Sequence, residues 1–232
     1  MSRIVQKKAI KGSQKWLQEL ANKHQSLFDD ELRSRLQLST DDRITWLSPL
    51  EEDEYSEYRD DAFLKRLSVQ LDNRSLNSFW PRGGPVWDGL AKTSRGDIIC
   101  VESKAHIQEL SSSCQASPQS LELIKRSLGE TAEFYTATSP ENWLHGYYQY
   151  ANRLAHNYLL RHLNGIKAWL VFLYFTNAIE MAGPKSKGKW RLAIETADRH
   201  LGIHHTQLDP YVIKAFIDVT KITGEDSGKK AE

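Results

Sequence analysis

Three residues in the middle of the chain, Asp88, Glu102 and Lys104, carry the side-chain types that hydrolysis of a phosphate ester requires. Two neighbouring carboxylates can bind a hard cation such as Mg²⁺, which keeps several waters and takes phosphate oxygens as its remaining ligands. The metal lowers the pKa of a bound water and stabilises charge on the phosphoryl group. A lysine ammonium beside them can orient the attacking water or stabilise the developing negative charge. This chemistry requires that the three side chains meet at one place.

A β-hairpin would provide that meeting place. Residues 86–93 and 97–106 have the pattern of two strands, and the loop 94–96 (Ser-Arg-Gly) joins them. Because side chains alternate along a strand, the second strand carries four side chains on one face: Cys100, Glu102, Lys104 and His106.

The loop also predicts the register of the hairpin. With Gly96 in the left-handed position of a three-residue loop, Thr93 lies opposite Asp97. Counting back from that pair puts Asp88 directly across from Glu102. Facing Cβ atoms lie about 4.5–5.5 Å apart, so both carboxylates could reach one divalent cation.

This arrangement resembles a known motif. Asp88, the hairpin turn and the tripeptide Glu102-Ser103-Lys104 resemble the PD-(D/E)XK motif of the restriction-endonuclease-like nuclease superfamily. The resemblance covers roughly residues 51–180. It implies an α/β fold with a central mixed β-sheet flanked by helices, in the order αβββαβ.

The resemblance also implies roles for individual residues. Asp88 and Glu102 would be metal ligands for Mg²⁺ or Mn²⁺, and Lys104 would be the catalytic lysine. The sequence departs from the motif at one point, because a Val-Trp pair precedes Asp88 and Pro85 stands three residues before it.

An acidic segment before the hairpin supplies a further candidate ligand. Residues 51–61 contain seven acids and lead into a predicted helix with an apolar stripe of Phe63, Leu64, Leu67 and Leu71. Glu57 and Asp60 continue this stripe backwards, so we expect them to face the protein, where carboxylates need partners. By resemblance Glu57 is the additional metal-binding acid of this helix, although the sequence leaves Glu57 and Asp60 as alternatives.

Candidate substrate-binding residues lie on a later predicted helix, residues 141–163. Gln149 and Arg153, together with Asn152 and His156, form a polar face opposite an aromatic stripe. By resemblance Gln149 and Arg153 could bind phosphate near the metal; a solvated helix face is the alternative. His106 could contact substrate because it follows Lys104 on the same strand face, and a structural role is its alternative.

Composition narrows the class of protein. The 31 Lys and Arg against 30 Asp and Glu give a formal charge of +1, which excludes a histone-like nucleic-acid binder but not a local basic groove. The two cysteines have no zinc-finger spacing. The N-terminus lacks the apolar core of a signal peptide, and the apolar run 168–175 is too short to cross a bilayer. We therefore expect a cytoplasmic protein with no membrane partner.

The elements around the hairpin suggest three parts of the chain. Residues 1–50 are predicted to form an N-terminal helical extension, with one long helix or two short ones over 13–38 and a short extended piece at 44–47. Residues 51–223 would be the nuclease-like α/β core, including a strand at 167–175 buried on both faces. Residues 224–232 would be a flexible tail.

The sequence thus predicts a Mg²⁺-dependent nuclease that hydrolyses phosphodiester bonds of nucleic acid with metal-activated water, with DNA as the favoured substrate. The alternative is a catalytically weak nuclease-fold module for nucleic-acid binding or assembly. No helix-turn-helix or zinc finger supplies target choice, so a homodimer or a targeting partner would have to supply it.

Overall fold

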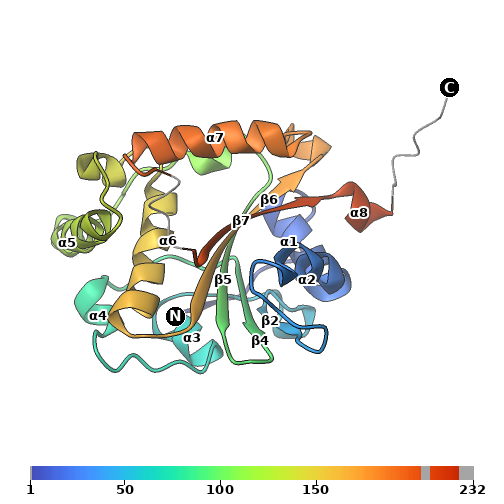
Figure 1. Cartoon of the computed structure of the whole chain (residues 1–232), viewed down its shortest axis with the longest axis horizontal. Helices are drawn as coiled ribbons and strands as arrows, with labels where there is room; N and C mark the ends of the chain where they lie inside the picture. Colours follow the sequence, from blue (N-terminus) through green and yellow to red (C-terminus); the bar gives the residue numbers. More distant parts are fainter. Residues whose placement is uncertain (1, 205–209, 225–232) are drawn as a thin grey trace.

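The computed structural model describes residues 2–204 and 210–224. Within them the chain forms a mixed sheet of five strands with helices against both faces (Figure 1). The strands follow in the order β2 (Ile44–Ser48), β4 (Gly89–Thr93), β5 (Ile98–Lys104), β6 (Ala168–Thr176) and β7 (Val212–Asp218). Neighbours are antiparallel from β2 to β5 and parallel from β5 to β7. This confirms the predicted α/β class with a mixed sheet.

Each face of the sheet carries its own apolar core, because side chains alternate along a strand. Cys100 of β5 belongs to the first core, whereas Ile99 and Val101 belong to the second. The first core is covered by α3 (Asp60–Arg66), α4 (Leu76–Phe79), α5 (Pro118–Phe134), α6 (Tyr148–Tyr158) and α7 (Lys187–His200). The second is covered by α1 (Gly12–Lys23), α2 (Gln25–Arg33) and α8 (Thr220–Thr223).

Strand β6 lies between β5 and β7 and contributes to both cores. Phe172 faces the first core and Leu173 the second, and both are almost completely buried. Burying one such side chain contributes about 1.5–3 kcal/mol relative to leaving it in water. The nearly continuous apolar run therefore forms the buried central strand that the sequence predicted.

The hairpin β4–β5 has the predicted register. Gly96 is left-handed, with φ of +85°, and the backbone N–H of Thr93 donates to the carbonyl of Asp97 at 2.9 Å. Gly89 pairs with Val101, so one further step places Asp88 opposite Glu102. The first strand is shorter than predicted, because it begins at Gly89 rather than at residue 86.

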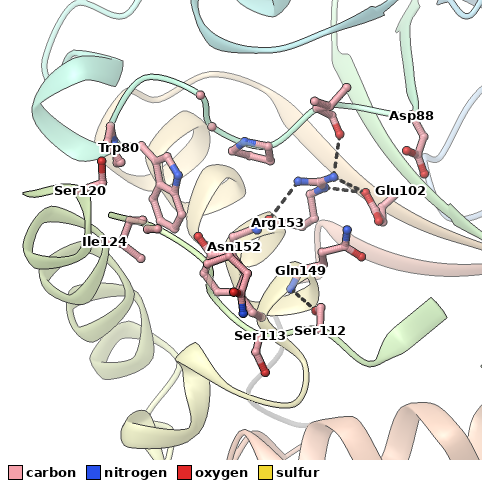
Figure 2. A pocket seen from close by; sticks show the side chains of 18 of the residues that line it. Trp80, Asp88, Glu102, Ser112, Ser113, Ser120, Ile124, Gln149, Asn152 and Arg153 are labelled. Atoms are coloured by element: carbon pink, nitrogen blue, oxygen red, sulfur yellow. Dashed lines mark hydrogen bonds and ion pairs between the residues drawn. The ribbon is translucent and has the colours of Figure 1, made fainter. Parts of the chain in front are cut away.

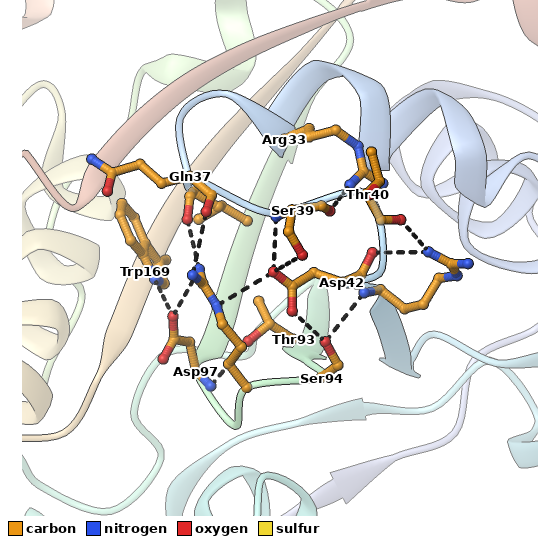
Figure 3. Close-up of polar contacts among 12 residues, drawn as sticks. Arg33, Gln37, Ser39, Thr40, Asp42, Thr93, Ser94, Asp97 and Trp169 are labelled. Atoms are coloured by element: carbon orange, nitrogen blue, oxygen red, sulfur yellow. Dashed lines mark hydrogen bonds and ion pairs between the residues drawn. The ribbon is translucent and has the colours of Figure 1, made fainter.

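The turn of the hairpin is anchored to the loop between α2 and β2 (Figure 3). Asp42 accepts a hydrogen bond from the Ser94 hydroxyl at 2.9 Å and another from the backbone N–H of Ser39 at 2.9 Å. Arg95 donates to the carbonyl of Leu36 at 2.7 Å. The hydrogen bonds from Ser39 and Ser94 lower the pKa of Asp42. These contacts hold the end of the hairpin that lies away from Asp88 and Glu102.

The predicted helix over the acidic segment is wrong in its first half. Residues Glu51–Asp53 form a single 3₁₀ turn, Glu54 and Tyr55 have positive φ, and Glu57 lies on strand β3 (Glu57–Tyr58). This strand pairs with β1 (Arg3–Ile4). The left-handed residues stop the helix, and the N-terminal segment supplies a strand partner that local sequence does not reveal.

The first 50 residues are part of the main sheet structure. Of the two alternatives for residues 13–38, one long helix or two short ones, the second is correct. The two helices, α1 and α2, pack in the second core. The extended piece becomes β2, an edge strand of the central sheet. The segment predicted as an extension thus contributes to the sheet and to one of its cores.

The later predicted helices form with shifted ends. The helix predicted over 141–163 consists of a 3₁₀ segment (Pro140–Leu144), α6 and a π-helical segment (Leu159–Leu163). The segment predicted as strand or helix over 212–221 is β7, followed by α8.

Across the described residues, no helix combines the length and apolar character that crossing a bilayer needs.

Candidate active site

A pocket of about 830 Å³ opens at the carboxyl end of β5. Its lining includes Asp88, from the residue before β4, and Glu102 and Lys104, from β5. It also includes Gln149 and Arg153, from α6. Figure 2 shows Asp88, Glu102, Gln149 and Arg153 converging on this pocket. The hairpin and α6 therefore bring five of the sequence-predicted site residues together.

The remaining walls of the pocket are mainly polar and uncharged. The segment before α5 and the start of that helix supply Ser112, Ser113, Gln115, Ser117 and Ser120. Trp80 and Ile124 add an apolar patch (Figure 2). Hydroxyl and amide groups can hydrogen-bond a polar ligand without adding charge.

Glu102 and Arg153 form an ion pair at the base of the pocket. The Nε and Nη2 atoms of Arg153 lie 2.6 and 2.5 Å from Oε2 of Glu102. Nη2 also donates to the carbonyl of Val86 at 2.7 Å, and Nη1 donates to Oδ1 of Asn152 at 3.0 Å. The guanidinium lies over the ring of Trp87, 4.8 Å from its centroid. The solvated helix face considered for Arg153 is therefore wrong, because this side chain is buried.

Lys104 contacts the other oxygen of Glu102. Its ammonium donates to Oε1 of Glu102 and to Oε1 of Gln149, the latter at 3.2 Å. Gln149 is held in turn by its backbone N–H, which donates to the Ser112 hydroxyl at 2.8 Å. Both oxygens of Glu102 thus contact cations.

Asp88 has a different environment, although it lies across the hairpin from Glu102. Its Oδ2 accepts hydrogen bonds from the backbone N–H and the hydroxyl of Ser103, at 2.7 and 3.1 Å. Within the described residues, no cation lies within ion-pair distance of this carboxylate, although Lys104 and Arg153 are near enough to affect it.

The pKa values of the two carboxyl groups move in opposite directions. Burial raises the pKa of Asp88 to about 7, and the negative charge of Glu102 contributes to the rise. Burial also acts to raise the pKa of Glu102, but the charges of Arg153 and Lys104 outweigh it and lower the pKa. For Lys104, burial acts to lower the pKa, and the charges of Glu102 and Asp88 outweigh it and raise the pKa.

Glu57 and Asp60, the two acids expected on the helix before the hairpin, lie differently with respect to the pocket. Glu57 does not line the pocket; its carboxylate accepts hydrogen bonds from Gln6 at 3.0 Å and from Gln14 at 3.1 Å. Burial raises the pKa of Glu57, with a contribution from Glu102, so Glu57 lies within electrostatic range of the site. The carboxylate of Asp60 accepts hydrogen bonds from the backbone N–H groups of Gly83 and Gly84, each at 3.1 Å. These bonds fix the loop that carries the two glycines, both of which line the pocket.

Neither His106 nor His156 lines the pocket. His106 follows the end of β5, contacts Gln108 and Glu109, and does not line the pocket. His156 is buried against Trp80, and its Nδ1 donates to the carbonyl of Asn152 at 2.8 Å. Burial lowers the pKa of His156 to about 3, so its ring is neutral at pH 7.

Ser103 and Asn152 contribute contacts that sequence reasoning did not assign. Ser103 holds Asp88, and Asn152 holds Arg153. No local pattern signalled the role of Ser103, because period-two alternation puts it on the strand face opposite Glu102 and Lys104. Asn152 had only its place on the polar face of α6.

The donor set fits a magnesium ion with few protein ligands. Among the residues that the structure describes, no group of three or more His, Cys, Asp and Glu side chains could hold a metal ion. Mg²⁺, however, is commonly bound through one or two carboxylates, with waters and phosphate oxygens completing its shell. Asp88 is a half-buried acid with a strongly raised pKa beside Glu102, so a cation there would relieve an unfavourable charge. Metal binding by Glu102 would require at least one of its cations to move away.

Comparison with known proteins gives no family for this chain. Searches against models of protein families, against curated proteins and against solved structures each found no match.

Proposed function

We propose that this chain is a Mg²⁺-dependent nuclease that hydrolyses phosphodiester bonds, with DNA as the favoured substrate. The observation that carries the proposal is the meeting of Asp88, Glu102 and Lys104 in one pocket, with Asp88 half-buried and its pKa raised to about 7. Strongly perturbed acids in a pocket are typical of functional sites.

The order of elements supports the same proposal. Helices α1 and α2 precede β2, β4 and β5, and helices α5 and α6 separate these strands from β6. The αβββαβ order that the resemblance to the PD-(D/E)XK superfamily implied would fit these elements if β3, α3 and α4, which lie between β2 and β4, are an insertion.

The side chains present suit distinct roles. Asp88 and Glu102 would hold Mg²⁺, which would supply an activated water and neutralise charge on the phosphate. Lys104 has three N–H donors, and Glu102 and Gln149 accept two of them. Its third proton can therefore donate to an attacking water or a phosphate oxygen. Arg153 would carry a second positive charge toward the phosphate when it moves from Glu102.

One observation favours the alternative, a catalytically weak module for nucleic-acid binding or assembly. Both oxygens of Glu102 already contact cations, so the charge that a metal would require is largely neutralised. In that alternative the buried ions would be structural, and the pocket would bind nucleic acid without turnover.

Cleavage assays separate the two functions. Purified protein is incubated with linear, circular and single-stranded DNA and with RNA, in Mg²⁺, Mn²⁺ or EDTA, with Asp88→Asn as the matched control. The nuclease proposal expects cleavage by the parent in Mg²⁺ or Mn²⁺ and none in EDTA or by the variant. Binding without cleavage of any substrate would support the binding module instead, and cleavage that persists in EDTA would contradict the metal-dependent mechanism.

A further inference from the structure

The first residues of the chain form a strongly basic segment. Residues 1–18 contain Arg3 and four lysines but no acid. We use the name lysine arm for residues 7–15, which carry these four lysines: Lys7, Lys8, Lys11 and Lys15. This local charge contrasts with the nearly neutral chain, whose formal charge is +1.

The lysine arm is fixed to the fold by hydrogen bonds. The side chain of Gln18, 3% exposed, donates to the carbonyl of Lys7 at 3.1 Å and accepts from the backbone N–H of Ala9 at 2.8 Å. These two contacts hold the start of the arm against α1. The arm therefore presents its lysines from a defined backbone.

The arm borders the candidate active site. Ser13, within the arm, lines the same pocket as Asp88 and Lys104. Gln14, the next residue, donates to Glu57 at 3.1 Å, and the charge of Glu57 acts on Asp88. The arm thus meets the pocket on the side of the carboxylates.

The lysines of the arm are available to a ligand. Lys7, Lys8 and Lys11 are exposed, whereas Lys15 is half-buried with its ammonium 4.0 Å from the ring centroid of Trp16. In the described part of the chain, none of the four lies within ion-pair distance of an acid. Of the three basic side chains that line the pocket, Lys104 and Arg153 are engaged by Glu102, whereas Arg82 is exposed.

We propose that the lysine arm binds the phosphate backbone of the nucleic-acid strand that enters the pocket. This inference rests on the proposed function and identifies the surface that holds the substrate. A nucleic-acid backbone has closely spaced negative charges, and its binding is driven largely by release of counterions to lysine and arginine. The exposed cations of the arm complement that charge, and the adjoining pocket can then accept the segment to be cut.

The test compares two sets of four substitutions. The arm variant is Lys7→Gln, Lys8→Gln, Lys11→Gln and Lys15→Gln. The control variant changes four lysines on other elements, none of which lines the pocket: Lys65→Gln, Lys92→Gln, Lys125→Gln and Lys167→Gln. Both variants remove the same charge, so a general electrostatic effect would change both equally.

Binding is measured in EDTA, where metal-dependent cleavage does not interfere. Fluorescence anisotropy with labelled duplex and single-stranded DNA is recorded over a range of KCl concentrations. The arm variant should reduce the slope of log K against log salt by about 3–4 for duplex and about 3 for a single strand, since each phosphate contact contributes about 0.9 or 0.7. The control variant should keep the parent slope, and a Lys→Arg version of the arm variant should restore it.

Outcomes for the arm and for the nuclease proposal are distinguishable. If the arm and control variants bind nucleic acid with equal slopes, the arm inference is overturned even where the parent cleaves DNA. If the arm variant instead loses binding only to phosphatidylserine-containing vesicles, the arm is a membrane contact and the inference is also overturned. Failure of the parent to cleave contradicts the proposed function but leaves the binding result to decide the arm.

Discussion

Glu102 and Arg153 form a buried ion pair between the central strand β5 and helix α6. Two guanidinium nitrogens contact one carboxylate oxygen at 2.6 and 2.5 Å, and the two side chains are 3% and 4% exposed. Because Lys104 contacts the other oxygen, the pair is part of a triad of one acid and two bases. The triad joins the hairpin to α6 and also forms the base of the candidate active site.

Replacement of Arg153 tests the structural side of this triad. Arg153→Met should lower the free energy of unfolding by about 3–5 kcal/mol, because Oε2 of the buried Glu102 carboxylate then has no cationic partner. The triple variant Glu102→Gln/Lys104→Met/Arg153→Met should lose less than the single one, since none of the three charges of the triad remains. Chemical denaturation measures both.

A matched control for this prediction is Arg35→Met, since Arg35 is exposed. This surface change should shift stability by no more than about 0.5 kcal/mol. Equal losses for Arg153→Met and Arg35→Met would show that the buried pair contributes little to folding.

Asp88 is predicted to favour function at the expense of stability. Its folded pKa, raised by burial from the ordinary 3.8 to about 7, means that the folded state loses stability as pH rises from about 4 to about 7, where the unfolded state is already ionised. At pH 8 in EDTA, Asp88→Asn should therefore raise the free energy of unfolding by about 1–4 kcal/mol. Thermal unfolding at pH 8 in EDTA measures this change. The control is Asp61→Asn, a substitution of an exposed carboxylate.

The same variant should lose stabilisation by metal. Mg²⁺ that binds only the folded parent raises its unfolding temperature, whereas Asp88→Asn should show little or no shift. An Asp88→Asn protein that is less stable than the parent in EDTA would indicate that the carboxylate is a structural group rather than a metal ligand.

The buried ring of His156 is expected to make the folded protein less stable at acid pH, independently of the carboxylates. Burial lowers its folded pKa to about 3, from an ordinary value near 6.5, so the unfolded state binds the proton more readily. As pH falls below about 6.5, the folded state should lose up to about 1.4 kcal/mol per pH unit from this group.

His156→Phe should remove this contribution. Between pH 6.5 and pH 4.5 the parent should lose about 2–3 kcal/mol more than the variant, as measured by chemical denaturation at each pH. Parallel stability curves for parent and variant would contradict the neutral buried state of this ring.

The hairpin was predictable because its determinants are local. A glycine at the left-handed position fixed the loop, and period-two alternation then determined which side chains share a face. Gly96 and the pairing of Gly89 with Val101 confirm both steps. The meeting of Asp88 with Glu102 follows from these local rules alone.

Other features depend on contacts between distant parts of the chain. Glu57 lies on a strand because residues Arg3–Ile4 pair with it, and this overrides the helical pattern of the apolar residues after it. Arg153 is buried because Glu102, 51 residues earlier, neutralises it. Neither partner can be identified from residue spacing within one element.

The most direct test of the proposed mechanism separates metal binding from chemistry at Lys104. Calorimetric titration with Mn²⁺ and cleavage assays are run on the same preparations of parent, Lys104→Ala and Lys65→Ala, the last being an exposed control. The mechanism predicts that Lys104→Ala loses cleavage but binds Mn²⁺ as well as the parent or better, because a neighbouring positive charge is gone, while Lys65→Ala behaves as the parent. Cleavage by Lys104→Ala at the parent's rate would contradict the role assigned to this lysine and the nuclease assignment of the motif with it.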